Sequence, residues 1–181
     1  MIESVDIFPT RFFGYKIEDD TLIQNIYSEV YEKRDKIRSI SWATEIQGDS
    51  YTTDYNSPVK IENFHLAMDL LSKSFAEAGV HFTLTEYWTA LYKKGSYHTM
   101  HNHTDNILKK DNYSGILYLT NCGQTYFFSQ NASSFDSFFT VRSQSGRFVL
   151  FPSSMPHQVV ANLDSDEERC VIAFNGDLRE L

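Results

Sequence analysis

The sequence predicts an α+β fold in which two helices precede a β-rich half. Residues 20–37 and 60–78 carry apolar side chains at a spacing of three and four, which is the period of a helix that buries one face. From residue 81 onward the chain changes to short segments rich in Thr, Tyr, Phe and Val, separated by turn residues. No linker or internal repeat interrupts the chain, so we expect a single domain spanning residues 1–181.

Each expected helix has recognisable end signals. Asp20 or Thr21 can cap the start of the first helix with a side-chain oxygen. Gly79 follows the second helix at the position where a left-handed glycine commonly closes a helix. Residues 40–59, which lie between the two helices, are polar and rich in turn formers, and they predict a loop or short strands.

Seven segments in the second half are expected to be strands, because they are short, partly alternating and rich in β-branched and aromatic residues. They are residues 81–92, 114–120, 125–129, 138–142, 147–151, 157–160 and 169–175. Helices followed by many short strands are typical of a sandwich or an open barrel, with the helices packed on one of its sheets.

The composition of the chain indicates which binding partners and which cellular compartment to expect. The net charge of −8, from 24 acidic and 16 basic residues, disfavours nucleic acid, because binding a phosphate backbone needs clustered Lys and Arg. The first residues lack the apolar stretch of a signal peptide and no run reaches about 18 apolar residues, so we expect no membrane association. Cys122 and Cys170 are expected to be reduced thiols of a cytoplasmic protein. The quaternary state stays open, a homodimer included.

A cluster of metal-binding side chains is the most specific feature of the sequence. His101, His103 and Asp105 lie two residues apart, and His157 opens a later strand. Alternation along a strand places His101 and His103 on one face and His98 on the other. Asp105 fits either a continued strand or a turn just beyond its end. Imidazoles with one carboxylate are typical of open-sided sites for a divalent ion, above all the facial triad of non-haem Fe(II) enzymes.

Arg169 adds a second requirement to this pattern. It is the first residue of an expected strand, on which it shares a face with Val171, Ala173 and Asn175. An Arg on an otherwise apolar inner face needs an anionic partner, because a buried unpaired charge is costly. A bound carboxylate would supply that partner, since the guanidinium can hold it through two parallel hydrogen bonds.

With these residues in place, the chain resembles the Fe(II)/2-oxoglutarate-dependent oxygenases. It is most similar to a branch of small 2OG-Fe(II) oxygenases from bacteria and phages, and the resemblance covers nearly the whole chain. Several short motifs in the right order carry it. They are IFPT (7–10), YWTALYKKG (87–95), HNHT (101–104), SGILYL (114–119), GRFVLFPSSMPHQV (146–159) and ERCVIAFN (168–175).

The resemblance implies a double-stranded β-helix, or jelly-roll, core with the N-terminal helices packed on one sheet. It implies that His101 is the first ligand of Fe(II) and that His157 is the distal ligand. Arg169 matches the residue that binds the distal carboxylate of 2-oxoglutarate. Tyr118 stands where related enzymes often place a hydroxyl near this cosubstrate.

Two positions depart from the family pattern. The second metal ligand is usually an Asp or Glu two residues after the first His, and in this chain that residue is His103. The fit to the family favours His103 as the ligand, with Asp105 as the alternative. Many relatives also carry a hydroxyl two residues after the cosubstrate Arg, where this chain has Val171. We therefore expect the second hydrogen bond to the cosubstrate from Tyr118, Tyr126 or a water.

The activity implied is that of a non-haem iron oxygenase, a hydroxylase that uses Fe(II), 2-oxoglutarate and O₂. Decarboxylation of 2-oxoglutarate would be coupled to oxidation of a small-molecule or peptide substrate, inside a bacterium or a phage-infected cell. Two other interpretations stand beside it. One is a cupin-like metalloprotein with three His and no 2-oxo acid, and the other is a jelly-roll binding protein without turnover. Arg169 favours the oxygenase, because neither alternative needs it.

Overall fold

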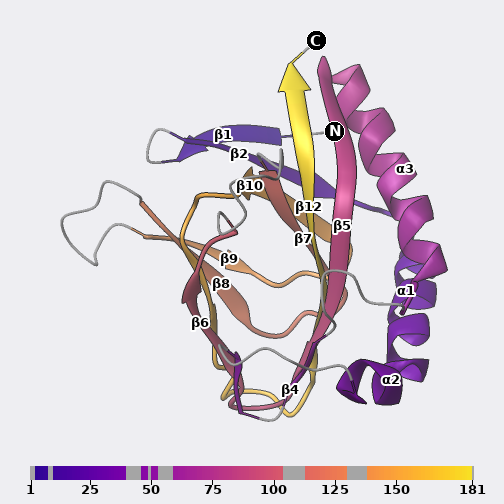
Figure 1. Ribbon diagram of the computed structural model, residues 1–181, viewed down its shortest axis with the longest axis vertical. Helices are drawn as coiled ribbons and strands as arrows, with labels where there is room; N and C mark the ends of the chain where they lie inside the picture. The colour runs from indigo at the N-terminus through magenta and orange to yellow at the C-terminus, as the bar shows by residue number, and fades with distance from the viewer. Residues whose placement is uncertain are drawn as a thin grey trace.

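Two antiparallel sheets face each other, and the helices cover the outer side of the larger sheet (Figure 1). The computed structural model describes residues 3–7, 10–39, 46–48, 50–52, 59–103, 113–129 and 138–180. Between β5 and β12 the chain passes repeatedly from one sheet to the other. This connectivity is that of a double-stranded β-helix, as expected, and it brings residues far apart in sequence to the space between the sheets.

Strands that are neighbours in a sheet are often distant in the sequence. In spatial order, the larger sheet consists of β1 (Glu3–Ile7), β2 (Thr10–Lys16), β10 (Arg147–Pro152), β7 (Tyr113–Tyr118), β12 (Arg169–Glu180), β5 (Val80–Tyr92) and β4 (Ser50–Thr52). In the same order, the smaller sheet consists of β3 (Ile46–Gln47), β6 (Tyr97–His101), β11 (His157–Val160), β8 (Gln124–Phe128) and β9 (Phe138–Arg142).

The first expected helix is divided into two. Helix α1 spans Asp20–Glu32 and α2 spans Arg34–Ser39, with a turn at Lys33 between them. The cap of α1 is Asp19, one residue before the expected position, and its carboxylate accepts a hydrogen bond from the backbone N of Leu22 at 3.0 Å. The Lys33 side chain donates to Glu29 and to the carbonyl of Lys60. It therefore connects the end of α1 to the segment that precedes α3.

The second helix, α3, spans Glu62–Glu77 and ends as expected, with Gly79 just beyond it at φ +76°. Its apolar stripe and that of α1 pack on the outer face of the larger sheet and form one core. The second core fills the space between the two sheets. The outer core includes Ile26, Val30, Phe64, Leu71, Leu117, Phe148 and Phe174, and the inner core includes Phe12, Tyr92, Ile116, Tyr118, Phe127, Phe151, Val159 and Val171.

The expectation that helices come first was wrong at the N-terminus, where β1 and β2 form a hairpin. Strand β2 pairs with β10 and so extends the larger sheet. The neighbouring side chains Phe12 and Phe13 are both buried, Phe12 in the inner core and Phe13 in the outer one. A strand buried on both faces does not alternate between apolar and polar residues, so its pattern gives no strand signal.

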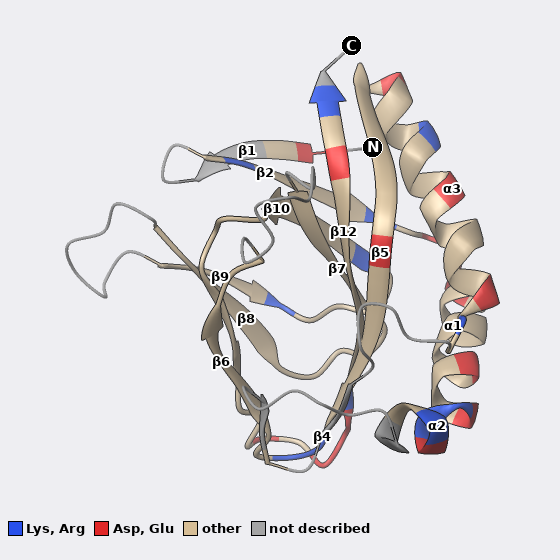
Figure 2. Cartoon of the chain, in the orientation of Figure 1, with Lys and Arg blue, Asp and Glu red and all other residues tan. Residues whose placement is uncertain are grey.

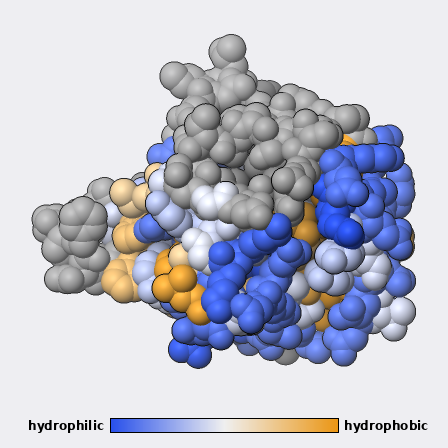
Figure 3. Space-filling view, turned by 90° about the horizontal axis from the view of Figure 1, so that it is seen from below, coloured by the Kyte–Doolittle hydropathy of each residue, from blue (hydrophilic) through white to orange (hydrophobic). Residues whose placement is uncertain are grey.

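Charged residues are frequent along the helices and sparser along the strands of the two sheets (Figure 2). In the view from below, hydrophilic residues also cover the side of the molecule that carries the helices (Figure 3). In the part of the chain that the structure describes, no helix is long and apolar enough to cross a membrane.

Candidate metal centre and its pocket

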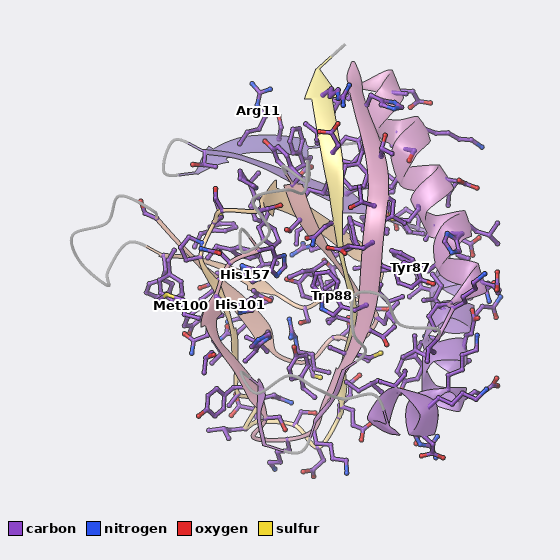
Figure 4. All side chains as sticks on the ribbon, viewed as in Figure 1. Arg11, Tyr87, Trp88, Met100, His101 and His157 are labelled. Carbon is purple, nitrogen blue, oxygen red and sulfur yellow. The ribbon has the colours of Figure 1, made fainter. Side chains whose placement is uncertain are left out.

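Three imidazoles meet between the two sheets at the end of β6. His101 is the last residue of β6 and is paired with His157, the first residue of β11, while His103 lies two residues beyond β6. One ligand atom from each ring lies within 4.8 Å of those of the other two. Figure 4 places His101 and His157 side by side, with Trp88 of β5 facing them. His157 is 3% exposed, and the other two rings are half-buried.

Two of the rings are oriented by a backbone carbonyl two residues earlier in the chain. Nδ1 of His101 lies 2.8 Å from the carbonyl oxygen of Thr99, and Nδ1 of His157 lies 3.0 Å from that of Met155. Because a carbonyl oxygen only accepts, Nδ1 must carry the proton in both rings. The lone pair of His101 and of His157 is then on Nε2, which is the tautomer in which a histidine binds a metal through Nε2.

His103 is held by different partners. Its Nδ1 lies 2.8 Å from the hydroxyl oxygen of Ser114 and 3.1 Å from the side-chain oxygen of Asn175. Its backbone N donates to the carbonyl of Ser153 at 2.9 Å, and its ring meets the edge of Trp88 at a centroid distance of 5.2 Å. His103 is therefore anchored to the larger sheet, whereas His101 and His157 belong to the smaller one.

Burial keeps His103 and His157 neutral. Burial, assisted by the neighbouring His101, lowers the pKa of His103 from the usual 6.5 to about 3. Burial first, and then His101 and His103, hold the pKa of His157 well below its usual value. A neutral imidazole with a lone pair on Nε2 is the form that binds a divalent ion, so the residues present fit a metal of the Fe(II) type.

His98 lies in the same pocket, contrary to the expectation that it faces away. Strand β6 has a bulge, because His101 pairs with His157 while His98 pairs with Val159. The two pairs are three residues apart on β6 but only two residues apart on β11. The extra residue in β6 places His98 on the same face as His101. The two rings stack at a centroid distance of 3.8 Å and an interplanar angle of 19°. Burial, followed by the effect of His101, lowers the pKa of His98 to about 3.

Arg169, the first residue of β12, is a buried cation with an incomplete set of partners. It is 1% exposed, its Nη2 donates to Thr125 Oγ1 at 2.8 Å, and its Nε donates to Ser143 Oγ at 3.3 Å. Nη1 is buried and has no hydrogen-bond partner among the described residues, and none of the ion pairs between described residues includes Arg169. A buried guanidinium without an anionic partner is costly, so an anion bound here would stabilise Arg169.

Arg169 and the histidines line one pocket. Apolar side chains from both sheets, among them Ala90, Ile116 and Val159, form much of the remaining wall. The complete lining is Trp88, Ala90, Tyr92, His98, His101, His103, Ile116, His157, Val159, Arg169, Val171 and Ala173. One pocket thus offers imidazoles from both sides for a metal and the guanidinium of Arg169 for an anion.

Tyr118 and Tyr126 do not line this pocket. Tyr118 is fully buried behind Arg169, with its ring 5.6 Å from the guanidinium carbon, and its hydroxyl donates to Thr125 Oγ1 at 3.0 Å. Burial raises the pKa of Tyr118. Tyr126 stacks on Phe138 at 4.8 Å. Thr125 and Ser143, which the sequence did not single out, are the hydroxyls that accept hydrogen bonds from Arg169.

Asp105, the alternative metal ligand, lies outside the described residues. Three imidazoles meet without it. The supporting residues Ser114 and Asn175 were not predicted as site residues, although both stand in motifs that carry the family resemblance.

Comparisons with known proteins agree with this geometry. The family model described as "Putative 2OG-Fe(II) oxygenase" matches residues 86–175, the segment that contains the three histidines and Arg169. No curated protein matches the chain by sequence.

Several solved structures share the fold. A Pseudomonas putida prolyl-4-hydroxylase is 21% identical with a TM-score of 0.63, and the match covers 92% of each chain. HygX from Streptomyces hygroscopicus, solved with nickel and 2-oxoglutarate bound, is 14% identical with a TM-score of 0.64, over 93% of this chain and 83% of HygX. The viral collagen prolyl hydroxylase of Paramecium Bursaria Chlorella virus-1 is 14% identical with a TM-score of 0.56, over 99% of this chain and 96% of that one.

Proposed function

Because this chain belongs to the Fe(II)- and 2-oxoglutarate-dependent oxygenases, we propose that His101, His103 and His157 hold the iron and that Arg169 binds the distal carboxylate of 2-oxoglutarate. The observation that carries this proposal is the buried Nη1 of Arg169, which lacks a partner among the described residues and belongs to a side chain that lines the same pocket as the three imidazoles. A dicarboxylate matches the chemistry of that lining, because one end could bind the metal while the other pairs with the guanidinium.

Each part of the chain has a defined task in this proposal. The three histidines present Nε2 to the metal, and Arg169 orients the cosubstrate. Thr125 and Ser143 hold the guanidinium in place from behind, with Tyr118 supporting Thr125. The apolar wall excludes water, which strengthens the interaction between the guanidinium and its anion. When bound, Fe(II) with 2-oxoglutarate and O₂ supplies the oxidising chemistry of this family, which hydroxylates a substrate.

The substrate of such an enzyme is a small molecule or a peptide. We propose that nucleic acid is not the substrate, since the chain is acidic, and that the protein works in the cytoplasm, where its two buried free thiols would stay reduced. We also propose that residues 1–181 act as one domain, because both sheets contribute to the pocket.

The test is a titration of the Fe(II)- or Co(II)-loaded protein with 2-oxoglutarate under anaerobic conditions. Arg169→Ala should weaken 2-oxoglutarate binding at least tenfold, since tenfold corresponds to about 1.4 kcal/mol and the loss of a buried charge partner costs roughly 2–5 kcal/mol. Arg169→Lys should fall between, because Lys keeps the charge but not the two parallel hydrogen bonds. Metal affinity without cosubstrate should hardly change.

Arg179→Ala is the matched control, since Arg179 lies on the same strand but its side chain is exposed and pairs with Asp177. Metal stoichiometry of the Ala variants at His101, His157, His103 and Asp105 tests the ligand set. We expect loss of metal in the first three and retention in Asp105→Ala. Normal 2-oxoglutarate binding by Arg169→Ala, or none by the wild type, would favour a cupin-like metalloprotein with three histidines.

A further inference from the structure

We infer that Glu86 and Asn175 are positioning residues that fix His103 in the tautomer required for metal binding. This inference rests on the metal centre proposed above, and it concerns the one of the three ligands whose Nδ1 is held by side chains and not by a backbone carbonyl. It also assigns a role to a carboxylate that does not line the pocket.

The two residues and Ser114 form a row across three neighbouring strands. Asn175 of β12 is paired with Glu86 of β5 on one side and with Ser114 of β7 on the other. Asn175 comes after Arg169, Val171 and Ala173 on β12, at the same spacing of two residues, and those three side chains line the pocket. Because side chains two apart on a strand share a face, Asn175 lies on the pocket side of the larger sheet. Asn175 is 4% exposed, so its amide must be satisfied by protein groups.

The orientation of the Asn175 amide follows from Glu86. Nδ2 of Asn175 donates to Oε1 of Glu86 at 2.8 Å. A carboxylate only accepts, so the NH₂ group must face Glu86 and the carbonyl oxygen must face the other way. That oxygen, Oδ1, lies 3.1 Å from Nδ1 of His103 and 2.7 Å from Oγ of Ser114.

The tautomer of His103 follows in turn. Oδ1 of Asn175 has no proton to give, so a hydrogen bond with His103 requires the proton to be on Nδ1. Nε2 is then left with the lone pair, as in His101 and His157. Ser114 cannot decide this by itself, because its hydroxyl can donate or accept and also lies 3.0 Å from Oγ of Ser153. The tautomer is therefore set by Glu86 through Asn175.

Through Asn175, the negative charge of Glu86 also acts on His103, which is a neutral metal ligand. His103 occupies the position at which the family pattern has a carboxylate, and an imidazole contributes no charge to the metal. Glu86 stands two hydrogen bonds away from that imidazole and polarises its N–H, which raises the basicity of the ring. The backbone carbonyls that hold His101 and His157 carry no net charge, so this effect is specific to His103.

The direct test observes the tautomers in the metal-free protein by ¹⁵N NMR of the histidine rings. His103 should carry its proton on Nδ1 in the wild type. In Glu86→Ala and Asn175→Leu, which remove the anchor and the acceptor, a mixture of the two tautomers is expected at His103 but not at His101 or His157. A wild-type spectrum with the proton of His103 on Nε2 would overturn the inference.

A Co(II) titration measures the consequence for metal binding. Glu86→Ala and Asn175→Leu should lower the affinity about 10- to 100-fold, the usual effect of losing a partner behind a metal ligand. Glu86→Gln, which can still accept the hydrogen bond, should recover part of the loss. Glu77→Ala, an exposed acid at the end of α3, is the control and should bind like the wild type.

Failure of the metal centre and failure of the positioning role give different results. If the wild type binds no Co(II), the metal centre itself is refuted, whatever the tautomer of His103. If the wild type binds Co(II) and Glu86→Ala matches it in both affinity and tautomer, the metal centre stands and the role of Glu86 and Asn175 is refuted. The Glu86 variants and the wild-type spectrum keep the test decisive even if Asn175→Leu does not fold.

Discussion

The position of Arg169 depends on the absence of a side chain at residue 123. Gly123 has a φ of +81°, and a Cβ there would lie 2.8 Å from Cδ of Arg169. The side chain of Arg169 therefore runs directly over the backbone of the turn before β8. A glycine at this position serves both the turn conformation and the close approach.

Gly123→Ala should separate these two roles. The positive φ alone costs roughly 1–2 kcal/mol of stability for a residue with a Cβ, and the contact should displace Arg169 and weaken 2-oxoglutarate binding by about tenfold. Gly95→Ala is a matched control, because Gly95 has a φ of +80° with no atom near its Cβ position. Urea unfolding and a 2-oxoglutarate titration of both variants give the answer. Equal cosubstrate binding in the two would contradict the idea.

At the scale of an element, β7 shows why a glycine stands inside a buried strand. A Cβ on Gly115 would lie 2.2 Å from Cζ of Phe174, a ring that is itself enclosed by Phe64, Phe82 and Phe148. The ring cannot move aside without disturbing the outer core. Gly115 thus lets β7 lie close to Phe174, and its neighbours Ser114 and Ile116 face the pocket side.

Gly115→Ala should therefore destabilise the fold by about 1–3 kcal/mol, the usual cost of inserting a methyl group into a filled core. Gly14→Ala provides the comparison, since Gly14 is also a strand glycine but has nothing within 4 Å of its Cβ position. Chemical unfolding of the two variants and the wild type measures the difference. A Gly115→Ala protein as stable as Gly14→Ala would show that Phe174 has room to move.

Elements with a regular spacing of apolar residues could be predicted from the sequence. Features that depend on which strands pair with each other could not. The stripe of α3, its closing Gly79, strand β5 and the strands from β7 to β12 follow from spacing and residue type, whereas β6 was not among the expected strands. The hairpin of β1 and β2 did not, because Phe12 and Phe13 are buried on opposite faces. The bulge in β6 is set by pairing with β11, so alternation placed His98 on the wrong side.

The same distinction holds for the candidate site. His101, His103, His157 and Arg169 were expected together because of their types and order, and they do line one pocket. The row of Glu86, Asn175 and Ser114 could not be predicted, since these residues become neighbours only through the pairing of β5, β12 and β7. Physical proximity across strands leaves no trace in local composition.

At the scale of the whole molecule, the buried histidines should make stability depend on pH. The pKa of His103 is lowered to about 3 and that of His157 is well below 6.5, whereas both titrate near 6.5 in the unfolded chain. Below pH 6.5 the unfolded chain binds protons that the folded chain does not, so folding becomes less favourable as the pH falls toward about 3.

The metal-free protein should lose up to about 1.4 kcal/mol per pH unit for each such imidazole, starting below pH 6.5. Urea unfolding at pH 8, 6.5 and 5 measures this slope, which should be shallower in His103→Gln. A free energy of unfolding that stays constant from pH 7 to pH 5 would mean that these rings take up protons in the folded protein as readily as in the unfolded chain.

The division of the ligands between the two sheets has a mechanical consequence. His101 and His157 belong to the smaller sheet, whereas His103 is tied to the larger one through Ser114 and Asn175. A metal bound to all three histidines would therefore cross-link the smaller and the larger sheet at the pocket. Without metal, that end can open locally. Hydrogen–deuterium exchange of β6 and β11 should slow when Co(II) is added, while exchange in α3, on the outer side, should stay unchanged. Equal protection of β6 with and without metal would mean that the layers hold together by packing alone.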